Sequence, residues 1–176
     1  RVPREFRVIA LRGLYTTPRG GFSWVPRDKQ GRARLEDFEP ALEALMTLIA
    51  AYPDLPSGGM DSVHVMGFSQ GAALAYVAAL RQPHRLRSVA GLAGFLPAGS
   101  DTLAEKPELR GLPFFIAHGT RDTTVPIAAA YHAVNFFRNL EAAVTFCEAN
   151  TGHKLDADCA RALAHFYRDL KGKQGE

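Results

Sequence analysis

The segment from Val63 to Leu74 constrains the fold of this chain more than any other, because an apolar strand pattern runs directly into Gly-Phe-Ser-Gln-Gly and then a helix-forming run. A serine exposed at such a turn needs a strained backbone, and the flanking glycines let strand and helix approach closely. This is the context of a nucleophile elbow. Ser69 is therefore the candidate nucleophile, the alternative being a plain Ser/Gly turn before a buried helix.

A serine hydroxyl is a weak nucleophile at neutral pH, so Ser69 requires a base and a group that orients the base. Asp122 follows the apolar strand pattern at 114–117, and His153 follows another at 143–147. An aspartate in such a turn is often only a turn-former. The order Ser69, Asp122, His153 is nevertheless that of α/β-hydrolases, and each residue follows a different strand, where open α/β sheets carry their sites.

The remaining histidines are weaker candidates for the base. They lie within a strand pattern, on a surface turn, upstream of the acid or within helices: His64, His84, His118, His132 and His165. His153 alone lies on a post-strand loop downstream of Asp122, and Gly152 before it permits an unusual backbone turn. We therefore predict His153 as the base.

Strand and helix patterns alternate along the chain. Strands are expected at 6–11, 63–68, 88–93, 114–117 and 143–147, helices at 35–49, 72–80 and 155–170, and a long loop at 12–34. Strands separated by helices predict an α/β fold with a mainly parallel sheet covered on both faces. We expect residues 1–176 to form a single domain.

Composition excludes several classes of protein. Hydrophobic residues make up 47% of the chain, but no apolar run reaches the length of a membrane span. The net charge is +3, yet acidic residues interrupt the basic ones, as in Arg121-Asp122 and Arg168-Asp169. Such interrupted charge favours a solvated surface over a nucleic-acid partner.

Two cysteines are too few for a disulfide framework. Cys147 belongs to an apolar strand pattern and Cys159 to the inner stripe of a helix, so both are expected to be reduced core residues. No spacing of histidine and cysteine indicates a metal site. With no signal-peptide pattern, we predict a cytoplasmic protein.

At its motifs the chain resembles the phospholipase/carboxylesterase family of α/β-hydrolases, which includes acyl-protein thioesterases and small bacterial carboxylesterases. The resemblance rests on Gly-Phe-Ser-Gln-Gly at 67–71, His-Gly-Thr-Arg-Asp with Val-Pro at 118–126, Gly-His at 152–153, Leu-Arg-Gly at 11–13 with Gly-Gly-Phe-Ser-Trp at 20–24, and Gly-Leu-Ala-Gly-Phe-Leu-Pro at 91–97. It implies an α/β-hydrolase fold and a serine hydrolase that cleaves small carboxylic esters or thioesters through an acyl-enzyme, without a cofactor.

The resemblance also implies further roles at the site. The backbone N–H of Gln70, the residue after the nucleophile, would supply half of an oxyanion hole. Aromatic and aliphatic residues expected around the acyl group are Phe22, Trp24, Phe95 and Leu96. For each of these four the alternative is an ordinary core residue under a long loop. The sequence does not determine the oligomeric state, and a homo-oligomer is one of the states it allows.

Family members carry an earlier strand that ends in a His-Gly-x-Gly type of loop, which supplies the second oxyanion N–H. Residues 12–14, Arg-Gly-Leu, fit the next family strand better. We therefore expect a further strand between the strands of Leu11 and Met66, with a glycine-containing loop that supplies this N–H. Upstream residues or another chain would provide it. Two alternatives stay open: a peptidase or acyl-aminoacyl hydrolase with the same triad, and a noncatalytic hydrolase-like module, which an absent oxyanion loop would favour.

Overall fold

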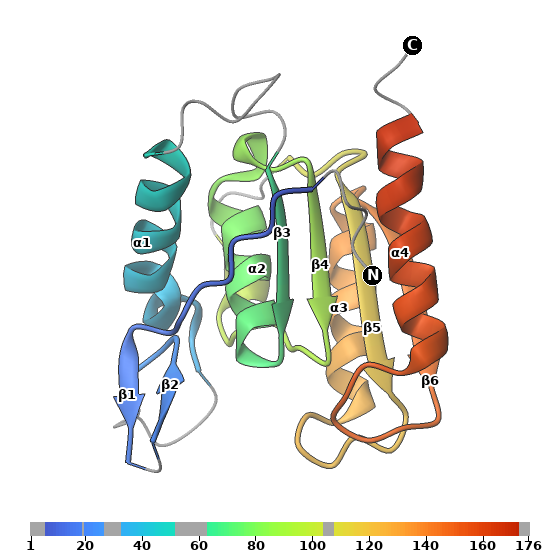
Figure 1. The fold of residues 1–176 in the computed structure, drawn as a ribbon, viewed down its shortest axis with the longest axis horizontal. Helices are drawn as coiled ribbons and strands as arrows, with labels where there is room; N and C mark the ends of the chain where they lie inside the picture. Colours follow the sequence, from blue (N-terminus) through green and yellow to red (C-terminus); the bar gives the residue numbers. More distant parts are fainter. Residues whose placement is uncertain (1–5, 19, 27–32, 52–62, 104–107, 173–176) are drawn as a thin grey trace.

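A sheet of four parallel strands forms the centre of the molecule (Figure 1). The computed structural model describes residues 6–18, 20–26, 33–51, 63–103 and 108–172. In spatial order the strands are β3 (His64–Phe68), β4 (Ser88–Leu92), β5 (Pro113–Gly119) and β6 (Ala143–Ala149). Because all four run in the same direction, their carboxyl ends meet at one edge of the sheet.

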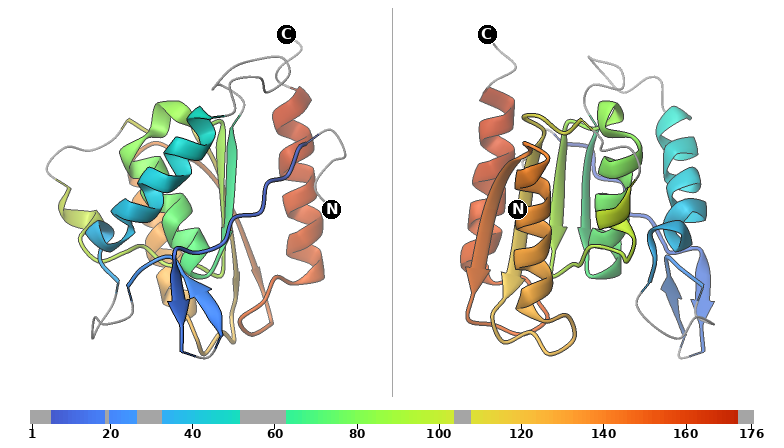
Figure 2. Two further views of the ribbon diagram at one scale, coloured as in Figure 1. Left: turned by 60° about the vertical axis from the view of Figure 1, so that its left-hand side comes forward. Right: turned by 180° about the vertical axis from the view of Figure 1, so that it is seen from behind.

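Helices cover both faces of this sheet, as the sequence predicts (Figure 2). One face carries α1 (Glu39–Ala50), α2 (Gln70–Arg81) and α3 (Ile127–Asn139), and the other carries α4 (Ala157–Gly172). Short 3₁₀ helices are η1 (Leu35–Phe38), η3 (Pro83–Arg85) and η4 (Ser100–Thr102). The expected burial of α2 is confirmed, since every residue from Ala72 to Leu80 is buried.

Stacked aromatic rings join α2, β5 and α3 in the larger of two core clusters. The rings of Phe114 and Phe137 stack with their centroids 4.2 Å apart, and Tyr76 lies 5.0 Å from Phe137. Burial raises the pKa of the Tyr76 phenol. Aromatic pairs of this kind stabilise a fold by about 0.5–1.5 kcal/mol beyond the area they bury. The cluster therefore holds α2, and with it the turn at Ser69, firmly against the sheet.

The expected strand at 6–11 is not formed. This segment crosses the sheet near β3 obliquely instead of running along its edge (Figure 1), so no backbone ladder forms. It is anchored by Phe6, whose ring packs edge-on against His64 and Tyr167, while Val8 and Leu11 stay exposed. Among the described residues, β3 has β4 as its one strand partner, so the segment of Leu11 does not pair with it.

The expected long loop at 12–34 contains an antiparallel hairpin. Its strands are β1 (Tyr15–Thr17) and β2 (Gly21–Ser23), with Thr16 opposite Phe22. The hairpin lies near the carboxyl-end edge of the main sheet (Figure 1). Residues 27–32 of the same loop lie outside the described residues. The hairpin therefore brings aromatic residues to the end of the sheet where the serine turn lies.

Cys147 and Cys159 form a disulfide, so the prediction of two reduced cysteines is wrong. The end of β6 and the first turns of α4 share the second core cluster, which brings the two Cα atoms to 5.7 Å. That separation is usual for a disulfide and depends on tertiary packing that sequence spacing does not reveal. Disulfides are typical of oxidising compartments, and the cytoplasmic location stays a prediction.

Within the described part of the chain, no helix has both the length and the apolar character needed to cross a membrane.

Candidate active site

Ser69 occupies a strained turn between β3 and α2. Its backbone has φ 54° and ψ −116°, a region that residues other than glycine rarely adopt. The turn is held because the Ser69 N–H donates to the Leu92 carbonyl at 2.8 Å. A Cβ on Gly67 would overlap the Gly71 carbonyl, so the close approach of strand and helix requires glycine there. This geometry supports the elbow interpretation.

Asp122 and His153 lie together on the loops that follow β5 and β6. Atom Nδ1 of His153 is 2.6 Å from Oδ2 of Asp122, whose side chain is fully buried. Oδ1 of the same carboxylate accepts the N–H groups of Thr124 and Val125 at 2.8 and 2.9 Å. An ionised Asp122 makes Nδ1 the protonated ring nitrogen and leaves Nε2 as an acceptor.

The hydrogen bonds to Asp122 decide its charge. Desolvation by burial acts to raise the pKa of this carboxyl, but hydrogen bonds from His153 and from the Val125 and Thr124 N–H groups outweigh it. The pKa of Asp122 therefore lies below its ordinary value, and the carboxylate is ionised at neutral pH.

Backbone hydrogen bonds tie the two loops to each other. The N–H of Thr120 donates to Ala149 O at 2.8 Å, and that of Arg121 donates to Thr151 O at 2.9 Å. The Arg121 guanidinium adds a bond of 3.0 Å to the Asn150 carbonyl. Because these bonds join the two loops directly before the acid and the base, the positions of Asp122 and His153 are coupled.

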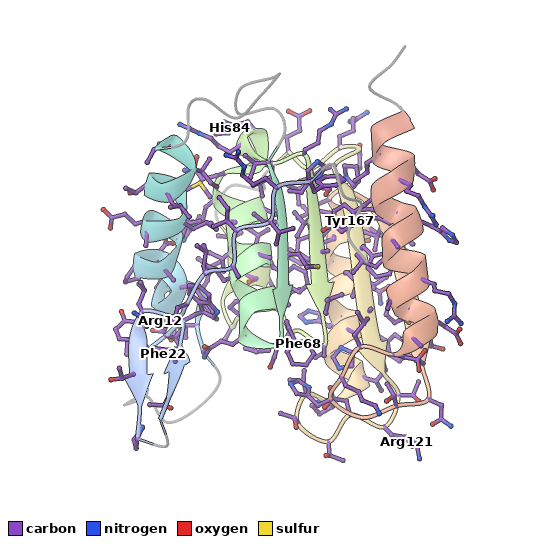
Figure 3. All side chains as sticks on the ribbon, viewed as in Figure 1. Arg12, Phe22, Phe68, His84, Arg121 and Tyr167 are labelled. Atoms are coloured by element: carbon purple, nitrogen blue, oxygen red, sulfur yellow. A yellow bond between two sulfur atoms is a disulfide. The ribbon has the colours of Figure 1, made fainter. Side chains whose placement is uncertain are left out.

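Phe68, the residue directly before Ser69, connects the base to the nucleophile turn. Its ring centroid lies 4.9 Å from that of His153, and it sits at the carboxyl end of β3 (Figure 3). Within the described part of the chain, no hydrogen bond joins the Ser69 hydroxyl to the His153 imidazole. Such bonds are often long before substrate binds. Sequence analysis missed Phe68, because a strand-end phenylalanine is indistinguishable from core.

His118 packs beneath the acid and cannot serve as the base. Its side chain is wholly buried, whereas that of His153 is 22% exposed. Atom Nε2 of His118 donates to Val125 O at 2.8 Å and lies 3.4 Å from Oδ2 of Asp122. Its Nδ1 has no hydrogen-bond partner among the described residues. His118 therefore braces the loop that carries Asp122, a role that its position before the acid did not reveal.

His64 lies at the opposite end of β3, among aromatic side chains. Its ring packs edge-on against Phe6 and Tyr167, and Nδ1 is 2.7 Å from the Ser88 hydroxyl. Desolvation, together with the nearby Arg87 charge, lowers the pKa of His64 to about 4. The unfolded chain thus binds a proton at His64 more readily than the folded chain.

We expect the free energy of unfolding to decrease as pH falls from 6.5 towards 4, because over this range the unfolded chain takes up a proton at His64 that the folded chain, with its lowered pKa, does not. His64 keeps some contact with solvent, so a loss of about 1–2 kcal/mol is expected. Urea denaturation at pH 7, 5.5 and 4 measures it. His64→Gln should flatten this dependence, and His84→Gln, at an exposed histidine, should not; equal slopes in all three proteins would contradict the assignment.

The residues predicted around the acyl group differ in exposure. Phe22 is 51% exposed on the hairpin. The Arg12 guanidinium lies over the Phe22 ring, with its carbon 4.4 Å from the ring centroid (Figure 3). Trp24 and Phe95 are partly buried against the main core, and Leu96 is buried within it. Phe22 and Trp24 are therefore better placed to meet a ligand than Leu96.

Gln70 is the first residue of α2, where backbone N–H groups have no acceptor within the helix. Its N–H is thus free to serve as the predicted oxyanion donor.

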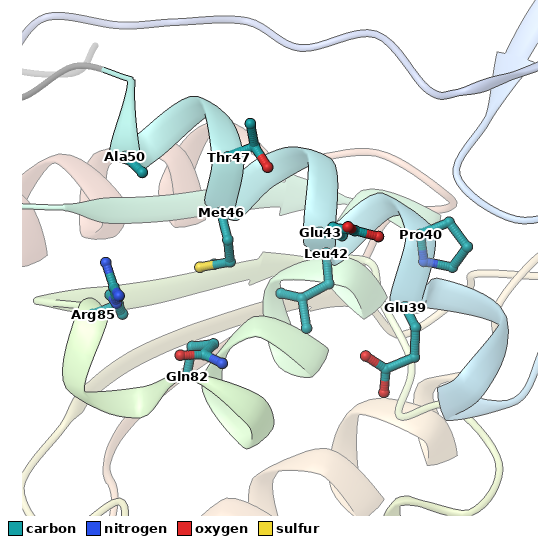
Figure 4. Close-up of a pocket in the computed structure, with 9 residues that line it drawn as sticks. All are labelled: Glu39, Pro40, Leu42, Glu43, Met46, Thr47, Ala50, Gln82 and Arg85. Atoms are coloured by element: carbon teal, nitrogen blue, oxygen red, sulfur yellow. The ribbon is translucent and has the colours of Figure 1, made fainter.

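A groove of about 610 Å³ lies away from these residues, between α1 and the end of α2 (Figure 4). It is lined by Glu39, Pro40, Leu42, Glu43, Met46, Thr47, Ala50, Gln82 and Arg85. None of the predicted site residues lines it. The part of the chain that the structure describes also holds no group of three or more histidine, cysteine, aspartate or glutamate side chains placed to bind a metal ion.

Comparison with known proteins finds carboxylesterases and acyl-protein thioesterases. Over 117 residues the chain is 30% identical to a probable carboxylesterase of Oryza sativa subsp. japonica, covering 65% of the chain and 44% of the relative. It is 28% identical over 119 residues to acyl-protein thioesterase 1 of Kluyveromyces lactis, covering 66% and 50%. The chain thus spans about half the length of these relatives.

The fold matches that of a Bacillus cereus carboxylesterase with a TM-score of 0.78 at 20% identity, covering 90% of the chain and 73% of that structure. The family model for phospholipase/carboxylesterase matches residues 14–170, which include the serine turn and both loops of the Asp122–His153 pair. The chain therefore belongs to the phospholipase/carboxylesterase family.

Proposed function

We propose that this chain is the catalytic part of a serine hydrolase that cleaves carboxylic esters or thioesters. One observation carries the proposal: the strained turn of Ser69 lies beside an Asp122–His153 pair whose ring packs on the neighbouring Phe68. Membership of the phospholipase/carboxylesterase family supports the same chemistry.

In the proposed reaction the Ser69 hydroxyl oxygen attacks the acyl carbonyl carbon, and Nε2 of His153 accepts the hydroxyl proton. The tetrahedral intermediate collapses when His153 returns that proton to the leaving alcohol or thiol, which leaves an acyl-Ser69 ester. Water then attacks this ester with His153 again as base, and the acyl–oxygen bond breaks as His153 returns the proton to Ser69, which releases the carboxylic acid. Asp122 holds the imidazole in the Nδ1–H tautomer and stabilises its protonated form.

The negative oxygen of the intermediate requires donors beside Ser69. The Gln70 N–H supplies one, and losing a single donor typically costs about 10²–10³ in turnover. For the second donor we propose a strand that pairs with β3 on the side away from β4. Among the described residues that side has no strand partner, and the nearby side chains of Met66 and Phe68 are 47% and 44% exposed.

The acyl group is proposed to lie against Phe22, Trp24 and Phe95, with Leu96 beneath them. A peptidase would use the same triad, and a noncatalytic module would keep the fold without turnover. A cytoplasmic location and a single domain remain predictions.

A panel of substrates tests this function. Purified protein is incubated with p-nitrophenyl esters of increasing acyl length, with acyl thioesters, and with aminoacyl p-nitroanilides. We expect hydrolysis of esters and thioesters and none of the anilides. Faster cleavage of the anilides would indicate the peptidase instead. Saturable ester binding without turnover, and without a covalent adduct from a fluorophosphonate, would indicate the noncatalytic module.

A further inference from the structure

The side chain of Gln70 connects the nucleophile turn to the aromatic hairpin. Its Oε1 accepts the backbone N–H of Trp24 at 2.7 Å and lies 3.0 Å from the Ser23 hydroxyl. Gln70 directly follows Ser69, whereas Trp24 lies 46 residues earlier in the chain. A single amide oxygen therefore joins the residue after the nucleophile to the segment that carries the predicted acyl-binding aromatics.

The bond from Trp24 is the firmer of the two. The Ser23 hydroxyl has one hydrogen and also lies 2.7 Å from the Val25 carbonyl, so it cannot donate to both oxygens at once. The Trp24 N–H has no such second acceptor among the described residues. Losing the Gln70 oxygen would leave this partly buried N–H without a partner, which is unfavourable.

The hairpin has little stability of its own. Its strands are three residues each, and an isolated two-stranded hairpin is marginal in water. It docks on the first turn of α2, where the Trp24 indole nitrogen comes within 3.5 Å of the position that a Cβ on Gly71 would occupy. Trp24 also packs against the main core. Side-chain packing and the Gln70 bond thus fix the same short segment.

We propose that the Gln70 side chain is a positioning residue that holds the hairpin carrying Phe22 and Trp24 against the nucleophile turn, and that the selectivity of the enzyme between long and short acyl chains depends on this bond. The part that concerns acyl chains rests on the proposed function. The part that concerns the hairpin does not, because it is measurable without substrate.

Trp24 is the single tryptophan of the chain, so its fluorescence reports the hairpin directly. Gln70→Met keeps the side-chain length and the backbone N–H but removes the acceptor, whereas Gln70→Glu keeps an acceptor oxygen. In Gln70→Met we expect red-shifted emission, about 2-fold stronger acrylamide quenching, and about 2- to 10-fold faster exchange of the Trp24 amide hydrogen, in line with the loss of one hydrogen bond. Gln70→Glu should keep wild-type quenching and exchange.

The matched control is Gln82→Met at the other end of α2, which should change neither readout. Unchanged quenching and exchange in Gln70→Met, or equal disturbance in Gln70→Glu, would overturn the proposal. Should Gln70→Met not fold, amide exchange in the wild type decides: a Trp24 amide hydrogen that exchanges as fast as an unprotected amide would overturn the proposal.

Acyl-length selectivity tests the second part. The ratio of kcat/KM for p-nitrophenyl octanoate to that for the acetate should fall about 10-fold in Gln70→Met and be kept in Gln70→Glu; taking the ratio cancels any change in the shared chemical step. If quenching and amide exchange of Trp24 increase in Gln70→Met but the kcat/KM ratio is unchanged, only the acyl-chain part of the proposal is overturned. If wild-type protein hydrolyses neither ester, the proposed function fails, while the fluorescence result still decides the role of Gln70.

Discussion

Replacing Ser69 with alanine is expected to abolish covalent labelling by a fluorophosphonate and to lower kcat for ester hydrolysis by about 10⁶-fold, the loss typical of removing a triad nucleophile. The fold should be unaffected. Alanine keeps the Cβ at the same positive φ, and the Ser69 hydroxyl makes no hydrogen bond within the described structure. We therefore expect the free energy of unfolding to change by less than about 0.5 kcal/mol.

Gel fluorescence and peptide mapping by mass spectrometry measure this result, with the adduct expected on the peptide that contains Ser69. Ser100→Ala is the control, because the Ser100 hydroxyl is buried and donates to the Pro97 carbonyl. It should keep the label. Labelling that persists in Ser69→Ala at the wild-type rate would mean that another side chain is the nucleophile.

Replacing Asp122 with asparagine is expected to lower kcat by about 10⁴-fold, because the substitution reverses the tautomer of the base. The side-chain oxygen of the introduced asparagine would still accept the N–H groups of Thr124 and Val125, which now bond to Oδ1. Its NH₂ group would then face Nδ1 of His153, where Oδ2 lies 2.6 Å away in the wild type. A donor at that place favours the Nε2–H tautomer, which cannot accept the serine proton.

The chain offers a matched control in its other Asp–His pair. Oδ1 of Asp101 lies 3.1 Å from Nε2 of His132, and both side chains are about half exposed. Asp101→Asn should change kcat by less than about 2-fold, since exposed pairs contribute little. Steady-state kinetics with a short p-nitrophenyl ester compares the two variants. Equal kcat values for both would remove Asp122 from the proposed mechanism.

The elements that sequence analysis predicted well are those with strong local signals. These signals are hydrophobic periodicity and turn motifs, which depend only on neighbouring residues. They mark the apolar run before Ser69, the buried helix after it, and the strands before Asp122 and His153. Because parallel strands end at one edge, predicting these strands was enough to predict that Asp122 and His153 meet there, and the structure brings them to 2.6 Å.

The features that sequence analysis missed depend on distant partners. Residues 6–11 have the apolar composition of a strand, but a strand also needs an aligned neighbour, and this segment crosses the sheet instead. The strands of the hairpin are too short to show alternation. The Gln70–Trp24 bond spans 46 residues and leaves no local trace. In each case contacts between distant parts of the chain determine the local structure. Local propensity and periodicity carry no information about such contacts.

The Cys147–Cys159 disulfide affects how the chain responds to proteolysis. It closes residues 147–159 into a covalent ring, and His153 lies inside that ring. If α4 detached from the sheet, the bond would still hold the first turn of α4 at Cys147, near the end of β6. A protease that cleaved between the two cysteines would leave two fragments that migrate as one molecule until a reductant separates them.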